Sequence, residues 1–211
     1  MSARADMPIP VRANLTIAML AVTANIGLLW AASHAGSWWG VGVTAIAFSF
    51  TNNTVFALQH EAAHGHFHPD ARANGAAGVL FAAFFPTIFQ VQRISHLGHH
   101  RRNRTDAELY DYVLPGQSWL LKSYWIYCLL FGFYWMIIPV AMLVYVLAPW
   151  AFRSEAFLLG PARWWGFEPF VADIAAAPVR TIWPQGLVTL AVQVALVLTL
   201  DLSFWGWLAA Y

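Results

Sequence analysis

The sequence predicts an all-α protein that crosses a membrane several times, with about four transmembrane helices and one re-entrant or interfacial segment. Hydrophobic residues make up 60% of the 211 positions, and the mean hydropathy is +0.56. Only 10% of the residues are charged, whereas soluble domains average about 25%. The apolar residues also fall into long runs, and about 20 such residues are enough to cross a bilayer.

The first two apolar runs cover residues 15–35 and 38–59, and each is long enough for a spanning helix. A rise of about 1.5 Å per residue carries either run across a hydrocarbon core of about 30 Å. The first run is long for a signal peptide and a second run follows at once, so we expect a retained helix. The second run also contains four polar residues, which need polar partners across a helix pair or in a cavity: Thr51, Asn52, Asn53 and Thr54.

The next apolar stretch, residues 79–89, is too short to span a bilayer, and Pro86 interrupts it. We expect a re-entrant or interfacial segment that returns the chain to the membrane face it left. Such a return would put residues 60–64 and 96–100 at the same face, whereas a spanning helix would separate them.

Residues 119–150 and 187–208 form the other two predicted spans. The first contains Pro139 and is predicted to be one kinked helix, or a helix followed by an interfacial turn. Residues 151–185 contain four prolines and several tryptophans, which predicts a loop along the interface. Asp201 lies inside the last run, where an ionisable side chain is costly and indicates a partner, a cavity or an interfacial position.

Charge and cysteine content exclude several classes of function. The net charge of +1 gives no indication of a nucleic-acid partner. Cys128 is the only cysteine, which excludes an internal disulfide and a zinc site built from cysteine pairs. On the predicted map, eight of the eleven Arg and Lys residues lie on the face that holds the N-terminus and residues 60–122. This bias marks that face as cytoplasmic.

Five of the eight histidines fall into two short rows, His60-Glu-Ala-Ala-His64 and His96-Leu-Gly-His99-His100. Residues three and four apart share one face of a helix, so each row offers imidazoles that point the same way. Neutral imidazole is a common ligand of iron, zinc and copper. The clustering favours a metal site over histidines that only solvate a membrane boundary.

Two other classes of function remain open at this point. His60-Glu61-Ala-Ala-His64 matches the His-Glu-x-x-His pattern of zinc proteases, in which the Glu is the general base. An intramembrane zinc metalloprotease would need a third ligand from elsewhere, and the second row is not expected for it. A non-catalytic metal-binding membrane protein is the other alternative.

The two rows resemble the first two histidine boxes of the membrane fatty-acid desaturase superfamily, which includes acyl desaturases, lipid hydroxylases and carotenoid ketolases. Gly65 follows the first box, and the sequence from His99 to Asp106 reads His-His-Arg-Arg-Asn-Arg-Thr-Asp. The resemblance is close over about residues 45–112 and elsewhere extends only to the order of helices.

The resemblance implies a non-haem di-iron centre on the cytoplasmic side, with O2 as co-substrate. A lipid acyl chain in the membrane would be desaturated, hydroxylated or ketolated, and a separate carrier such as ferredoxin or a cytochrome b5-type protein would supply electrons. The implied metal ligands are His60, His64, His96, His99 and His100. We expect one desaturase-like domain over residues 1–211.

The sequence departs from this superfamily in one respect. A third box, again His-x-x-His-His, follows the last pair of membrane helices in the superfamily, but no histidine follows His100 here. Five imidazoles are too few for a complete di-iron site. We expect either an N-terminal fragment of a longer enzyme or a short paralogue with a degenerate or single-metal site, and no turnover by these 211 residues alone.

Several nearby residues are candidates for supporting the ligands through hydrogen bonds. His66 and His68 follow the first box, where Gly65 and Pro69 predict the end of the helix and therefore a loop. Glu61 either contacts a ligand or faces water. Asp106 either contacts a ligand or pairs with a neighbouring arginine, and Asp201 is a further candidate.

Overall fold

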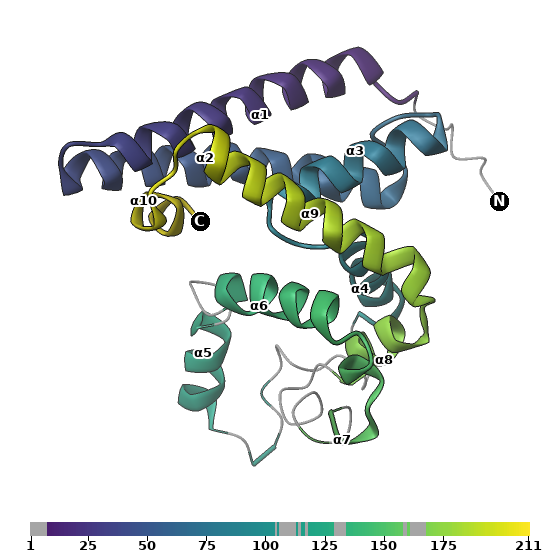
Figure 1. Cartoon of the computed structure of the whole chain (residues 1–211). Coiled ribbons are helices and arrows are strands. Elements are labelled where there is room, and N and C mark those ends of the chain that lie inside the picture. Colours follow the sequence, from purple (N-terminus) through teal and green to yellow (C-terminus); the bar gives the residue numbers. More distant parts are fainter. Residues whose placement is uncertain are drawn as a thin grey trace. The chain divides into compact units, whose positions relative to one another are not determined.

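The computed structural model describes residues 8–103, 105, 113, 115–116, 118–128, 134–157, 160 and 168–211. Every regular element in this part of the chain is helical, which confirms the predicted all-α class. The chain divides into two compact units, and Figure 1 shows the helices of each. The first unit comprises residues 1–85 and 194–211, and the second comprises residues 86–193.

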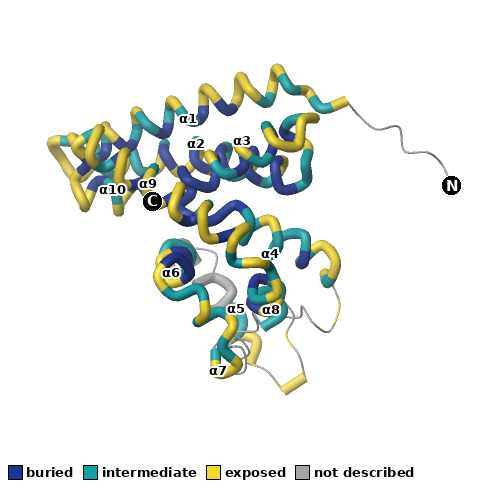
Figure 2. The backbone as a smooth tube through the Cα atoms, turned by 45° about the vertical axis from the view of Figure 1, so that its right-hand side comes forward, coloured by how far each residue is buried: buried dark blue, intermediate teal, exposed yellow. Residues whose placement is uncertain are grey.

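The first unit is built on a hairpin of two long helices, α1 (Val11–His34) and α2 (Trp38–His64). The buried residues of α1 recur every three or four positions and so form one stripe along the helix: Ala18, Ala21, Asn25, Leu29 and Ala32. The other apolar side chains of α1 are largely exposed, as the yellow segments of Figure 2 indicate. This pattern is typical of a helix that packs on one side and contacts lipid on the other.

A buried polar contact joins the two helices of the hairpin. Asn25 is completely buried, and its Nδ2 donates a hydrogen bond of 2.9 Å to Oδ1 of Asn52. The hydroxyl of Thr51 donates to Oδ1 of Asn25. The expectation of partners across a helix pair is therefore confirmed for Thr51 and Asn52. Asn53 is exposed, and the Thr54 hydroxyl donates to the carbonyl of Phe50 in its own helix.

The last helix, α10 (Phe204–Ala210), packs on this hairpin at a glycine. A Cβ atom added at Gly206 would lie 2.4 Å from Cα of Ser33, so only glycine allows the two backbones to approach this closely. The ring of Tyr211 meets the buried Phe48 edge-on, with ring centroids 5.1 Å apart. The third helix of the unit, α3 (Ala71–Phe84), packs against α2.

The second unit contains α4 (Phe89–Arg102), α5 (Trp119–Cys128), α6 (Tyr134–Leu147), the 3-10 turn η2 (Ala151–Arg153), α7 (Glu155–Phe157) and α8 (Glu168–Ala176). The first part of α9 (Val179–Thr199), up to Gln193, belongs to it as well. Its core consists of Ile88, Met142, Tyr145, Ile174 and Ile182. Val91 and Ile94 of α4 pack against this core.

Two side chains of α9 bind backbone groups on either side of the start of α4. Oε1 of Gln185 accepts a hydrogen bond of 2.9 Å from the N–H of Gln90, and the Thr189 hydroxyl donates one of 2.7 Å to the carbonyl of Thr87. Backbone groups at a helix start lack partners within the helix, and an apolar environment offers no water to replace them. These bonds therefore fix where α4 begins.

Three helices in the described part of the chain, α1, α2 and α9, are long and apolar enough to cross a membrane. Helices α3 and α4 together would count as one broken span or a re-entrant loop, since helical structure stops at Phe84 and resumes at Phe89. The predicted interruption at Pro86 is thus confirmed. Helix α3 begins earlier than the apolar stretch suggested, because Asp70 caps it by accepting from the N–H of Ala73.

The run 119–150 contains α5 and α6, and residues 129–133 between them lie outside the described part, so the continuity predicted for this run falls on residues that are not described. Two other predicted elements need correction. The loop predicted for residues 151–185 is wrong, because α8 and the start of α9 occupy much of it. Pro169 lies in the first turn of α8 and Pro178 directly precedes α9, positions at which proline does not disrupt a helix.

The predicted last span is confirmed as a long apolar helix, but its bounds of 187–208 are wrong, because α9 begins at Val179 and ends at Thr199. Asp201 adopts a left-handed conformation with φ of 49°, and the N–H of Leu202 bonds to the carbonyl of Val197. This pattern ends a helix with a left-handed cap. Asp201 therefore lies exposed in the turn before α10 and not inside a spanning helix.

We expect Gly206→Ala to lower the free energy of unfolding by about 1–3 kcal/mol, because the new methyl group collides with the backbone of α1. Thermal unfolding of the detergent-solubilised protein measures this effect. Gly42→Ala is the matched control, since nothing lies within 4 Å of its added Cβ. Equal unfolding midpoints for the two variants would contradict the packing described for α10.

We expect Asp201→Gly to keep or raise the free energy of unfolding, by up to about 1 kcal/mol, because glycine adopts the left-handed conformation without strain. Asp201→Val should lower it, since β-branched residues resist a positive φ. Thermal unfolding separates the two variants, and metal analysis checks any additional role. A marked loss of bound metal in Asp201→Gly would show that the carboxylate supports the ligands.

Candidate metal centre

The first histidine row occupies the last two turns of α2. The rings of His60 and His64 lie with centroids 4.8 Å apart, as expected for residues four apart on one helix face. Both residues are half-buried, whereas Ala62 and Ala63 are buried in the first unit. The alanines anchor the helix, so the imidazoles are held in one direction.

Helix α2 ends directly after His64 because Gly65 turns into the left-handed region with φ of 79°. The N–H of His66 bonds to the carbonyl of Glu61, and that of Gly65 bonds to the carbonyl of Ala62. This arrangement is a common C-terminal cap. The prediction that the helix stops here is confirmed, and His68 consequently does not extend the row.

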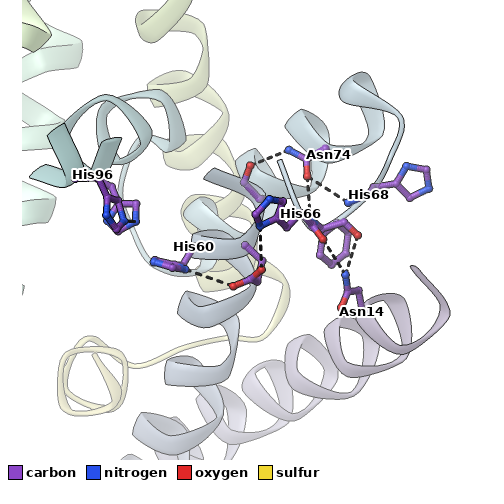
Figure 3. Close-up of polar contacts among 10 residues, drawn as sticks. Asn14, His60, His66, His68, Asn74 and His96 are labelled. Carbon is purple, nitrogen blue, oxygen red and sulfur yellow. Dashed lines mark hydrogen bonds and ion pairs between the residues drawn. The ribbon is translucent and has the colours of Figure 1, made fainter. Parts of the chain in front are cut away.

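Two asparagines hold the loop that follows the first row (Figure 3). Oδ1 of Asn74 accepts from the N–H groups of Phe67 and His68, while its Nδ2 donates to the carbonyl of Ala62 at 2.8 Å. Nδ2 of Asn14 donates to the carbonyls of His66 and Phe67. Asn14 belongs to the first turn of α1, so the row lies at the N-terminal end of α1, as the sequence predicted.

Glu61 lies between two histidines of this region. Its carboxylate is 3.6 Å from Nδ1 of His60 and 3.9 Å from Nδ1 of His66, and its side chain is 48% exposed. Both distances are longer than a hydrogen bond, so Glu61 lies beside these two rings while its side chain stays largely exposed.

The two histidines that follow the first box lie differently. The ring of His66 stacks on His64 with centroids 5.8 Å apart. Nδ1 of His68 accepts from the N–H of Asp70, and Figure 3 shows its ring pointing away from His60 and His66. The side chain of His68 therefore stabilises the loop through its bond to Asp70.

The second row occupies the C-terminal half of α4. Nε2 of His96 and Nε2 of His100 are 2.9 Å apart, and the ring of His99 lies 5.9 Å from that of His100. Two ligand nitrogens at about 2.1 Å from one metal ion and at right angles would be about 3.0 Å apart. The His96–His100 pair thus fits adjacent positions on one ion.

The remaining candidates lie outside both rows. Asp106 falls outside the described residues, and Asp201 lies in the turn between α9 and α10. His34 ends α1, is exposed, and contacts the carbonyl of Trp30 through Nδ1 at 2.9 Å. Asn14 and Asn74, which hold the first row's loop, were not identified from the sequence. The sequence signal for these two asparagines was only their position, since each is a polar residue in the first turn of a helix.

No curated protein and no solved structure matches the chain. A family model described as fatty acid desaturase matches residues 36–211, a range that includes both histidine rows. The match gives no support to the zinc protease alternative. The two histidine boxes predicted this relationship, and the match confirms it: the chain belongs to the fatty acid desaturase family.

Proposed function

We propose that the protein is an O2-dependent, non-haem di-iron oxidoreductase that acts on a lipid acyl chain, as a fatty-acid desaturase or a related lipid hydroxylase. Family membership supports an oxidoreductase of membrane lipids, and the three apolar helices agree with a membrane protein. The observation that carries the proposal is the His96–His100 pair, whose Nε2 atoms are spaced as adjacent metal ligands.

The proposed ligand set joins the two rows. It consists of His60, His64, His96, His99 and His100. The support is the spacing of the two boxes, the family match across both, and the helical geometry that directs the imidazoles of each row to one side. Both rows are proposed to lie at the cytoplasmic face, for which the bias of Arg and Lys is the support.

Iron bound at this site would supply the activation of O2 and the removal of hydrogen from an unactivated C–H bond. Desaturation consumes O2, two electrons and two protons, and releases two water molecules with the new C=C bond. The helices α2 and α4 hold the imidazoles, and the protein's grip on the acyl chain selects the bond that reacts. The distinction between desaturation and hydroxylation therefore lies in how the chain is held.

The electrons are proposed to come from a separate carrier, such as ferredoxin or a cytochrome b5-type protein. Arg101 is 64% exposed in the last turn of α4, next to the second row. A basic side chain at this place suits an acidic carrier or a lipid phosphate.

The number of ligands bears on how many metal ions bind. Five imidazoles fall short of two complete coordination shells, so two irons would need further ligands. The metal-to-protein ratio of the purified full-length gene product distinguishes a site with one ion from a site with two.

We expect His96→Ala to remove most of the bound iron, because it takes away one nitrogen of the closely spaced pair. The protein is loaded anaerobically with Fe²⁺, washed, and analysed for iron and zinc by mass spectrometry. His34→Ala is the control, since this histidine is exposed and its Nδ1 contacts the carbonyl of Trp30 in its own helix. Preferential zinc binding that is insensitive to His96→Ala would contradict the proposal.

We expect Glu61→Gln to keep the bound iron while weakening its affinity by up to about 10–100-fold, the usual effect of altering a group behind a ligand. In the full-length gene product, O2 consumption with an acyl-lipid substrate and a reductant should persist at saturating iron. A zinc protease behaves differently, because loss of its general base abolishes peptide hydrolysis while His96→Ala spares it. That pattern, measured on a membrane-peptide substrate, would replace the oxidoreductase proposal.

A further inference from the structure

Helix α4 has two chemically different faces. At about 100° per residue, Val91, Ile94, Gly98 and Arg102 fall on one face, roughly opposite His96 and His100, while His99 lies to one side between the two faces. Val91 and Ile94 pack against the apolar core of the second unit. Gly98 is buried, whereas the histidines are half-buried or exposed. The back of the helix is therefore the side through which the unit holds the histidine row.

An ion pair with α8 holds the C-terminal half of that back face. Nη1 of Arg102 donates a hydrogen bond of 2.6 Å to Oδ2 of Asp173. The Arg102 and Asp173 side chains are only 19% and 28% exposed. The Arg102 guanidinium also lies 5.4 Å from the ring centroid of Phe170, one turn earlier on α8. Partial burial and a short charged hydrogen bond make this contact directional.

The absence of a side chain at Gly98 makes this contact possible. A Cβ atom added there would lie 2.6 Å from both Nη2 of Arg102 and Oδ2 of Asp173. The carboxylate and the guanidinium therefore lie directly against the surface of α4, two residues from the imidazole of His96 or His100 along the chain.

We propose that Asp173 is a positioning residue for the second histidine row. By holding Arg102 against Gly98 it fixes the rotation of α4 about its own axis, and so the direction in which His96, His99 and His100 point. The inference rests on the proposed function, because it concerns the metal that the row would bind.

A metal site tolerates only small displacements of its ligands. Apolar contacts such as those of Val91 and Ile94 are non-directional and allow a helix to turn slightly. Metal–ligand distances vary by only about 0.2 Å, and imidazole nitrogens lie farther from the helix axis than the backbone does, so small rotations displace them most. A directional ion pair on the back face removes that freedom.

Arg101 offers a matched comparison on the same helix turn. It lies 3.6 Å from the same Asp173 oxygen, but its side chain is 64% exposed. Exposed ion pairs of this kind contribute little. A role in positioning the row should therefore belong to Arg102 and not to Arg101.

The experiment uses the full chain loaded with Co²⁺, whose visible absorption reports the geometry of its ligands. We expect Asp173→Asn and Arg102→Gln to weaken Co²⁺ binding by about tenfold and to change the absorption bands, with unchanged helical circular dichroism. Asp173→Glu should recover most of the wild-type spectrum, and Arg101→Gln should resemble wild type.

The positioning role would be overturned if the Asp173→Asn protein unfolds at a lower temperature but keeps the wild-type Co²⁺ affinity and spectrum. If Asp173→Asn does not fold, the double variant with Arg102→Asp and Asp173→Arg is used in its place. A folded double variant with the wild-type Co²⁺ spectrum supports the positioning role. A folded double variant with a different Co²⁺ spectrum contradicts it. If the His96→Ala variant instead gives the same Co²⁺ spectrum as the wild-type protein, the proposed function is wrong, and the inference fails with it.

Discussion

Where a helix is broken in an apolar environment, the backbone N–H and C=O groups at the break need hydrogen-bond partners. The position of the second histidine row depends on the partners that this protein provides at the start of α4. The carbonyl of Thr87 lies in the break before α4, and the N–H of Gln90 lies in the first turn of the helix. Thr189 and Gln185 supply the missing partners from α9. Because each unpaired group would cost several kcal/mol in hydrocarbon, these two side chains decide where α4 starts. The position of every later residue on the helix follows from that start.

Both histidine rows are presented in the same way. In each, the side of the helix away from the imidazoles is buried: alanines of α2 in the first unit, and Val91, Ile94 and Gly98 of α4 in the second. Each helix is thus held from behind, and the side that carries nitrogen ligands stays accessible. The first row has an additional support, because the loop after it is bound by Asn14 and Asn74. The second has the ion pair of Arg102 with Asp173.

The sequence predicted what local patterns determine. Helical spacing identified the histidine rows, Gly65 marked the end of α2, and Thr51 and Asn52 were recognised as needing partners. The missed features depend on position within an element or on distant residues. Pro169 and Pro178 were weighed as helix breakers although they occupy helix starts, and hydropathy did not register the left-handed turn at Asp201. Asp173 lies 71 residues from Arg102, so no local pattern joins them.

The buried bond between Asn25 and Asn52 also bears on how the chain enters the bilayer. A first helix that moved into lipid alone would carry the unpaired amide of Asn25 near its middle, where polar side chains are costly. Its partners, Thr51 and Asn52, are synthesised only about 26 residues later. The chemistry of this contact therefore favours release of α1 and α2 from the insertion machinery as a pair, already joined through their amides.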